Sequence, residues 1–299
     1  MKPNVEFSIV EGMSLEDYLA VDALGSGDLR LIARSPWHYA NRIRTASTPA
    51  MLRGTLAHCA ILEPGAMAAR YAVVPEGAPN RPSRRQWDAK KPSPESRAAM
   101  DWWTNFNAEI DGREIVRLLD YELCHEQIEA VSRNSFLAGL LRSGRGEVSI
   151  FWRDEKTGIK CKARPDWLPN NVAMIPLDLK TCVDESPSGF GRAAARLRYD
   201  LQDAHYTAGI EAVTGEKVAA FVFAAVTNKP PVLAVPYFLT DEIRAQGREE
   251  RDELLALLAH CRREDHWPAY GDGPQLLDFP AYAKHGGEVE VEWNEENQA

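Results

Sequence analysis

Residues 160–181 read KCKARPDWLPNNVAMIPLDLKT, and this stretch decides how the whole chain is interpreted. Asp178 and Lys180 lie two residues apart in an apolar run, and Asp166 follows an Arg-Pro pair earlier in the stretch. Successive side chains of a β-strand point to opposite faces, so Asp178 and Lys180 share one face while the leucines beside them take the other. A divalent metal that activates water for attack on a phosphate needs hard oxygen ligands and a nearby positive group. The stretch therefore favours a metal-dependent phosphodiesterase.

The same pattern also has a purely structural explanation. An Asp and a Lys two residues apart could form a solvated strand face or a simple ion pair, and the string D-x-K occurs by chance in many proteins. Other residues in the chain are needed to distinguish between the two interpretations.

Length and composition indicate an ordinary globular protein. The chain has 299 residues, 44% hydrophobic and 26% charged, which is enough to bury a substantial core. Its apolar runs are far shorter than the roughly 20 residues that span a bilayer, and its first residues lack the layout of a secretion signal. We therefore expect a cytoplasmic protein without a membrane partner. Its five cysteines are scattered and include no C-x-x-C pair, which predicts free thiols and no disulfide framework, zinc knuckle or iron–sulfur cluster.

The net charge of -9 argues against a protein that simply coats nucleic acid, because such proteins are usually basic. It leaves open an enzyme that acts on DNA, since part of the acidity lies in the tail from about residue 286. Local basic clusters remain, each of them either a solvated face or a phosphate-binding surface. These clusters are Arg42 and Arg44; Arg81, Arg84, Arg85, Lys90 and Lys91; and Arg192, Arg196 and Arg198.

Hydrophobic periodicity predicts helices, then three strands, a helical segment, two strands and a last helix. Pro36 is expected to open a new helix after the capping residue Ser35. The Pro-, Gly- and Arg-rich residues 75–94 are expected to form an exposed loop. The predicted helices are 13–21, 26–43, 51–62, 95–110, 121–141 and 241–263, with one or two further helices over 190–213. The predicted strands are 147–153 and its hairpin partner from residue 159, then 172–181, 218–226 and 232–238.

This order predicts an α/β (α+β) fold in which a central mixed sheet is flanked by helices. We expect a single domain over residues 1–299. Its parts are a helical N-terminal part with a loop over 1–143, a catalytic sheet core over 144–240, and a C-terminal helix with an acidic tail over 241–299. Neighbouring antiparallel strands lie about 4.8 Å apart, so Asp166 near the end of the second strand and Asp178 on the third can meet at one ion.

Several strings between about Ser26 and Phe238 resemble one nuclease family. These strings are GTLAHCAILEP (54–64), EVSIFWRDEKTGIKCKARPDWL (147–168), DLKT (178–181) and YDLQDAHYTAGI (199–210). They resemble the RecE-type exonucleases (exodeoxyribonuclease VIII-like) of the PD-(D/E)XK nuclease superfamily, which are related to phage lambda exonuclease. The resemblance implies a PD-(D/E)XK, restriction-endonuclease-like core.

The superfamily motif, an acid followed by acid-x-lysine, matches Asp166 and Asp178-Leu179-Lys180. The second acid is Asp where many relatives have Glu. The RecE-like signature adds a helical His, a Glu before the first strand, a Gln and a Tyr after the motif, and an Arg-Arg pair. The matching residues here are His58, Glu147, Gln202, Tyr206 and Arg84-Arg85.

The chemistry of these residues suggests their roles. Asp166 and Asp178, with the carbonyl of Leu179, would be the direct Mg²⁺ ligands, because a hard cation prefers oxygen. Lys180 would position or deprotonate the attacking water. His58 could ligate or orient a second metal, for which Mn²⁺ is a better partner than Mg²⁺. The alternative for His58 is a core histidine satisfied by backbone groups.

The remaining candidates also have two interpretations. Glu147 is either an active-site carboxylate or a surface carboxylate at the start of a strand. Gln202 is assigned to the catalytic site and Tyr206 to the substrate groove, although an amide and a tyrosine could equally be core and cap residues. Guanidinium groups pair with phosphate oxygens, and the candidates for this role are Arg34, Arg84 and Arg85.

The resemblance implies a Mg²⁺-dependent exonuclease that degrades linear double-stranded DNA from its ends in the 5′ to 3′ direction, in phage or prophage recombination. It also implies a single-strand annealing partner and a homo-oligomeric ring around DNA. The residues themselves leave two alternatives open: a PD-(D/E)XK endonuclease, and a non-catalytic DNA-binding or assembly protein of the same fold.

Overall fold

The computed structural model describes residues 7–43, 48–170, 174–271 and 273–278. The helices are α1 (Leu15–Ala20), α2 (Ser26–Arg34), α3 (Pro36–Ala40), α4 (Pro49–Leu62), η1 (Pro64–Ala66), α5 (Met67–Arg70), α6 (Arg84–Trp87), α7 (Pro94–Glu109), α8 (Leu118–Arg133), α9 (Ser135–Leu140), α10 (Pro187–Leu197), α11 (Tyr199–Thr214) and α12 (Asp241–Glu264). The strands are β1 (Ser8–Val10), β2 (Tyr71–Val74), β3 (Glu114–Arg117), β4 (Gly144–Gly146), β5 (Ser149–Arg153), β6 (Lys160–Ala163), β7 (Trp167–Pro169), β8 (Leu177–Cys182), β9 (Val222–Thr227) and β10 (Ala234–Tyr237).

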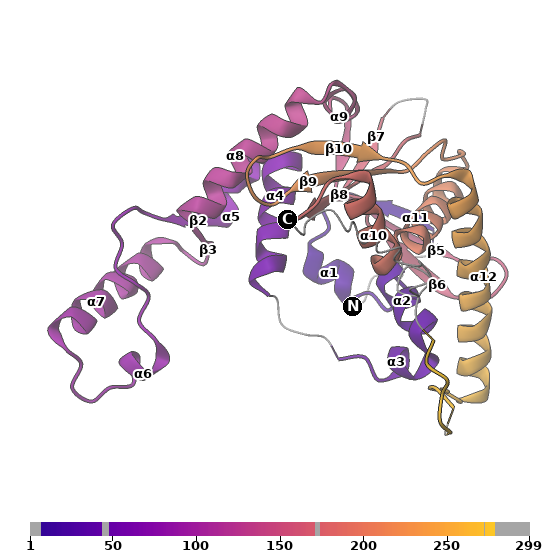
Figure 1. The fold of residues 1–299 in the computed structure, drawn as a ribbon, viewed down its shortest axis with the longest axis horizontal. Helices are drawn as coiled ribbons and strands as arrows, with labels where there is room; N and C mark the ends of the chain where they lie inside the picture. Colours follow the sequence, from indigo (N-terminus) through magenta and orange to yellow (C-terminus); the bar gives the residue numbers. More distant parts are fainter. Residues whose placement is uncertain (1–6, 44–47, 171–173, 272, 279–299) are drawn as a thin grey trace, which may run out of the picture.

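Two sheets and the helices around them form the body of the molecule (Figure 1). The larger sheet has the strand order β10-β9-β8-β7-β4, in which β8 and β9 are parallel and the other neighbours antiparallel. The smaller sheet has the order β1-β5-β6 and is antiparallel throughout. This architecture confirms the predicted α/β (α+β) class with a mixed sheet flanked by helices.

Strands β8 and β9 lie in the middle of the larger sheet and are covered on both faces. The leucines of β8, Leu177 and Leu179, pack with alternate residues of β9 and with Leu137 of α9. The opposite face of β9 packs against Phe190 and Tyr199 from α10 and α11. The predicted alternation along β8 is therefore confirmed, and it leaves Asp178 and Lys180 together on the face opposite the leucine cluster.

Helix α11 joins the two sheets to the C-terminal helix. Leu201 and Ile210 of α11 are fully buried in one cluster with Ile150 and Trp152 of β5 and with leucines of α12. Burying a leucine or isoleucine side chain contributes roughly 1.5–3 kcal/mol. This packing sets the position of the α11 face that carries Gln202 and Tyr206.

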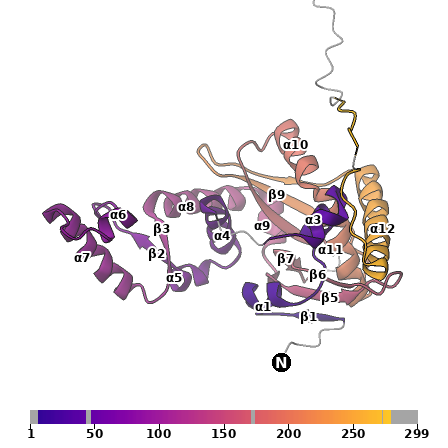
Figure 2. The ribbon, with the colours of Figure 1, turned by 90° about the horizontal axis from the view of Figure 1, so that it is seen from below.

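An arm leaves the body between α4 and α8 (Figures 1 and 2). It consists of α6, α7 and the parallel pair β2–β3. An aromatic cluster on α7 holds it together: Trp102 stacks on Phe106, and the indole N–H of Trp103 donates to the carbonyl of Pro79 at 2.9 Å. Pro79 lies in the segment that was predicted to be a loop, which contains the short helix α6.

The strand order differs from the predicted one, in which the hairpin and the strand over 172–181 were neighbours in one antiparallel sheet. The hairpin β5–β6 belongs to the smaller sheet, and it is β7, directly after Asp166, that pairs with β8. Strands β1, β2, β3, β4 and β7 were not predicted, because each is only three or four residues long and has no clear alternation. The first 143 residues are therefore not purely helical.

Helix boundaries follow local capping chemistry. Ser35 caps α3 by accepting from the N–H of His38, so the predicted break before Pro36 is confirmed. The single helix predicted over 121–141 is divided, because Asn134 ends α8 and its side chain caps α9. The predicted strand over 172–181 begins only at Leu177, and its residues 172–173 lie outside the described residues.

Two further predictions concern the whole chain. All five cysteines are free thiols, as predicted. Among the described residues, no helix combines the length and the apolar character that crossing a bilayer requires. Arg44 and the acidic tail from residue 286 lie outside the described residues, and the division into parts of one domain stays a prediction.

Candidate active site

The centre of the candidate site is the polar face of β8. The ammonium of Lys180 lies 2.5 Å from Oδ2 of Asp178 and 4.8 Å from the ring centre of Tyr199. The other carboxylate oxygen of Asp178 accepts a hydrogen bond from Nε2 of Gln202 at 2.9 Å. Asp178 is buried, and each of its two carboxylate oxygens has a side-chain partner.

Asp166 is tied to the same strand through the backbone. Its Oδ2 accepts the N–H of Leu179 at 2.6 Å, and its Oδ1 lies 3.4 Å from Nδ1 of His58 on α4. Leu179 stands between Asp178 and Lys180, so this bond places the Asp166 carboxylate beside the D-x-K motif. The structure thus brings Asp166, Asp178, Lys180, Gln202 and His58 together.

Glu147 reaches the site from the link between β4 and β5. Its backbone φ of 52° is left-handed, which is uncommon for a residue other than glycine and costs about 1–3 kcal/mol. Its N–H donates to the carbonyl of Asp166 at 3.0 Å. Its carboxylate pairs with Nε of Arg164 at 2.7 Å, and Arg164 is itself held by Ser149. Glu147 is therefore a positioned carboxylate and not a free residue at a strand start.

A divalent cation fits this set of donors. One ligand atom from each of His58, Glu147 and Asp166 lies within 4.8 Å of the others. Asp178 is adjacent, and although Lys180 and Gln202 occupy it, each carboxylate oxygen keeps a second lone pair that can bind a cation. Carboxylate oxygens suit Mg²⁺ and Mn²⁺, and the imidazole favours Mn²⁺ or a similar transition metal.

The electrostatics of the acids supports this fit. Burial, together with the charge of Asp166, raises the pKa of Asp178 to about 6. Burial and the charge of Asp166 likewise raise the pKa of Glu147 above its usual range. Burial alone would raise the pKa of Asp166 as well, but the charges of His58 and Lys180 and the Leu179 N–H outweigh it and lower that pKa. The acids repel one another, and a bound cation would relieve this repulsion.

The two basic groups are held in their charged forms. Burial lowers the pKa of His58, but the Asp166 carboxylate and the other acids outweigh burial and raise that pKa to about 9. The pKa of Lys180 is also raised, because the charge of Asp178 outweighs burial. His58 would have to lose its proton before its ring nitrogen could bind a metal.

Two cavities meet at Lys180 and Tyr206, which line both of them. The larger, of about 1050 Å³, is also lined by His58, Glu147 and Asp166. The smaller, of about 300 Å³, contains Gln202, Tyr199 and Arg30 among its lining residues. Asp166 therefore faces the larger cavity and Lys180 faces both, whereas the buried Asp178 lines neither.

The predicted arginines lie elsewhere. Arg34 is exposed at the end of α2 and lines neither cavity. Arg84 and Arg85 lie on α6 in the arm, exposed, and Arg84 pairs with Asp88 at 3.7 Å. Their contact with DNA stays a prediction.

Three residues of the site were not predicted. Arg164 directly precedes the Pro165-Asp166 pair, and Tyr199 opens the string that holds Gln202, so both lay within sequence already singled out. Arg30 is one helical turn before Arg34, and the sequence does not say which of the two faces the site.

Comparisons with known proteins agree with this architecture. The sequence profile of a family described as a PDDEXK-like domain of unknown function (DUF3799) matches residues 30–278. The crystal structure of a protein from Eubacterium rectale, described as a "Putative exonuclease", has a TM-score of 0.55 at 15% identity, covering 91% of this chain and 96% of its own.

A second solved structure, SSO0001, has a TM-score of only 0.27 at 16% identity, over 58% of this chain and 68% of its own. No curated protein matches the sequence. The predicted PD-(D/E)XK-like core is thus confirmed, while the RecE type within that superfamily stays a prediction.

Proposed function

This chain belongs to the family of PDDEXK-like domains, and from that premise we propose that it is a metal-dependent exonuclease that hydrolyses phosphodiester bonds of linear double-stranded DNA. One observation carries the proposal. Asp166 and Asp178 lie beside Lys180, held by the Leu179 N–H and by Gln202, and Lys180 lines both open cavities.

The residues of the site would divide the work as follows. Asp166, Asp178 and the carbonyl of Leu179 would hold Mg²⁺, or Mn²⁺, with Glu147 and His58 available beside them. A bound divalent cation supplies Lewis-acid stabilisation of the phosphate and lowers the pKa of water. Lys180 would orient the attacking water and stabilise negative charge that develops on the phosphate. Its raised pKa favours this role over that of a general base.

The finer parts of the proposal have separate support. Action at DNA ends is supported by the Eubacterium rectale protein, which is described as a "Putative exonuclease" and whose fold this chain shares. The 5′ to 3′ direction, the ring-shaped homo-oligomer and a single-strand annealing partner in phage-type recombination rest on the resemblance to RecE-type exonucleases. Tyr206, which lines both cavities, is the best-placed of the four predicted DNA contacts.

A nuclease assay tests the proposal. A linear duplex with 5′-phosphates and a closed circular plasmid are incubated with Mg²⁺, with Mn²⁺ and with EDTA. We expect nucleotide release from the linear duplex only, dependent on the metal, and a loss of roughly 10²–10⁴-fold in the Lys180→Gln variant. Asp101→Asn, an exposed carboxylate on α7, is the matched control for Asp178→Asn. Nicking of the plasmid would identify an endonuclease, and equal release by wild type and Asp178→Asn would refute the site.

A further inference from the structure

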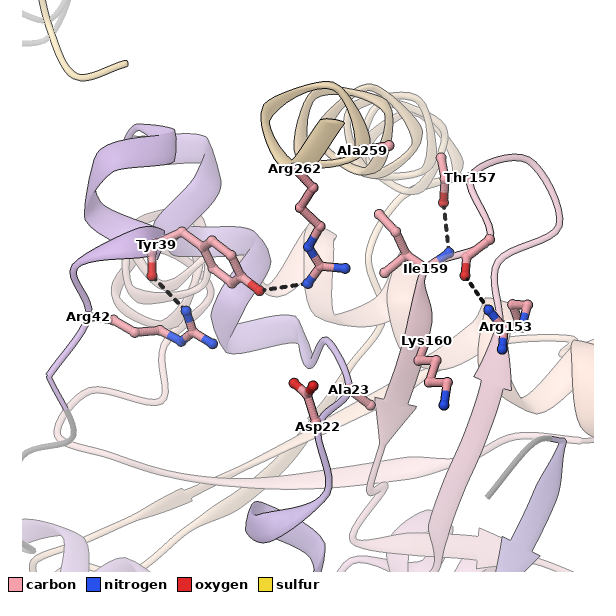
Figure 3. Close-up of a pocket in the computed structure, with 11 residues that line it drawn as sticks. Asp22, Ala23, Tyr39, Arg42, Arg153, Thr157, Ile159, Lys160, Ala259 and Arg262 are labelled. Atoms are coloured by element: carbon pink, nitrogen blue, oxygen red, sulfur yellow. Dashed lines mark hydrogen bonds between the residues drawn. The ribbon is translucent and has the colours of Figure 1, made fainter. Parts of the chain in front are cut away.

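A further cavity, of about 560 Å³, lies between α3, the β5–β6 hairpin and α12 (Figure 3). It shares no lining residue with the two cavities of the candidate active site. The hairpin connects the two places. Its open end carries Ser149, which accepts from Arg164 beside Glu147, and its turn end carries the pair Arg153 and Lys160. Ser149 and Arg153 are four residues apart in a strand, which is roughly 13 Å.

Cations dominate the lining of this cavity. Arg42, Arg153, Lys160 and Arg262 line it, and the acid among its lining residues is Asp22. They come from the end of α3, from both strands of the hairpin and from α12, so only the folded chain brings them together. In a chain with a net charge of -9, this local excess of positive charge is a specific feature of the surface and not a reflection of composition.

Tyr39 holds two of these cations in place. The guanidinium of Arg42 lies 4.1 Å from the centre of the Tyr39 ring, and it donates to the Tyr39 carbonyl at 2.7 Å. Arg262 donates to the Tyr39 hydroxyl at 3.0 Å. Arg42 also pairs with Asp28 at 3.3 Å, whereas the described residues provide no carboxylate partner for Lys160 or Arg262. Figure 3 shows the guanidinium of Arg262 directed toward the Tyr39 hydroxyl, and the extended side chain of Lys160 on the hairpin.

We propose that this cavity is a phosphate-binding site that contacts the DNA backbone beyond the active site. Guanidinium forks and ammonium groups donate without accepting, and their geometry matches phosphate oxygens. The rise of roughly 13 Å along β5 from Ser149 to Arg153 corresponds to about four nucleotide steps of 3.4 Å. As a contact to DNA, this site rests on the proposed function. A mononucleotide released by the enzyme would present the same phosphate chemistry.

Binding without cleavage tests the site. A labelled 20-base-pair duplex is titrated by fluorescence anisotropy in EDTA between 50 and 200 mM salt. The cavity variant is Lys160→Ala with Arg262→Ala. The matched control is Lys156→Ala with Arg263→Ala, which removes the same charge from neighbouring positions whose partners are Asp252 and Glu264, outside the cavity. Equal unfolding midpoints verify that both variants fold.

We expect the cavity variant to bind the duplex roughly tenfold more weakly than the control, with a salt slope lower by about 2. Calorimetry with deoxyadenosine monophosphate separates the two sources of phosphate. Loss of mononucleotide binding with unchanged duplex binding would keep the phosphate site and assign it to the free nucleotide. Equal behaviour of both double variants toward both ligands would overturn the inference.

Nuclease assays on the same variants separate this inference from the proposed function. A chain that binds duplex through the cavity and cleaves nothing would contradict the proposed function alone. An active nuclease whose binding is indifferent to the cavity variant would contradict this inference alone.

Discussion

The carboxylate of Asp166 accepts the backbone N–H of Leu179 at 2.6 Å. Because Leu179 separates Asp178 from Lys180, this bond links Asp166, which follows β6, directly to the D-x-K motif of β8. The position of Asp166 is therefore set by the backbone of β8, and a change at Asp166 affects both charge and local structure.

Two substitutions of Asp166 separate these effects. Asp166→Asn keeps an oxygen for the Leu179 N–H but removes the charge, so we expect loss of nuclease activity and a loss of stability limited to the missing ion pair with His58. Asp166→Ala leaves a buried N–H without a partner, which costs about 1–3 kcal/mol in addition. Urea unfolding and nuclease assays on both variants check this. Equal stability of the two variants would contradict the structural role of the bond.

Arg164 is expected to position Glu147 and so to influence metal binding. Arg164→Lys keeps the positive charge but cannot hold Glu147, Ser149 and the Met13 carbonyl at once, as Arg164 does. We expect the metal concentration for half-maximal activity to rise roughly 10- to 100-fold. The matched control is Arg145→Lys, because the guanidinium of Arg145 pairs with Glu11. A metal titration that is identical for Arg164→Lys and this control would refute the role.

His205 is expected to make stability depend on pH. Burial is the main cause that lowers its pKa to about 3, and Nε2 lies within hydrogen-bonding distance of the carbonyls of Leu24 and Lys162. The folded state resists protonation while the unfolded state takes up a proton below about pH 6.5, so the stabilisation is complete above that pH and is lost as pH falls toward 3.

The variant His205→Gln keeps a donor for these carbonyls and removes the titration. Between pH 7 and pH 4 we expect it to lose less stability than wild type, by on the order of 2 kcal/mol. Urea unfolding at several pH values measures the difference. Parallel pH profiles for the two proteins would show that His205 does not titrate on unfolding.

Gly247 of α12 determines how closely that helix approaches α11. A Cβ at this position would lie 2.6 Å from the carbonyl oxygen of Asp200, a backbone atom that cannot rotate away. We expect Gly247→Ala to cost about 1–3 kcal/mol and to lower activity by displacing the helix that carries Gln202. Gly139→Ala in α9, where a Cβ meets nothing within 4 Å, is the control and should be neutral or stabilising by up to about 1 kcal/mol. Equal denaturation midpoints for the two variants would contradict this packing.

The parts of the site that lie close in sequence were predictable. Period-2 alternation is a property of any strand, so it was enough to place Asp178 and Lys180 on one face and the leucines on the other. The helical interval between Gln202 and Tyr206 was likewise sufficient to place both on one side of α11. The mixed α/β class followed from the order of helical and strand-like periodicity.

Only the tertiary structure shows the contacts between distant segments, and the strands that are too short to show a hydrophobic period. The sequence by itself identified Asp166, Asp178 and Lys180 as a D…D-x-K motif, because local geometry and side-chain chemistry determine what such a motif can hold. It could not pair β7 with β8, choose Arg30 over Arg34 for the site, place Arg84 and Arg85 on an arm, or bring four cations to the lining of one cavity. Those outcomes depend on how sheets and helices pack, and packing energy is shared among many residues, none of which carries the signal alone.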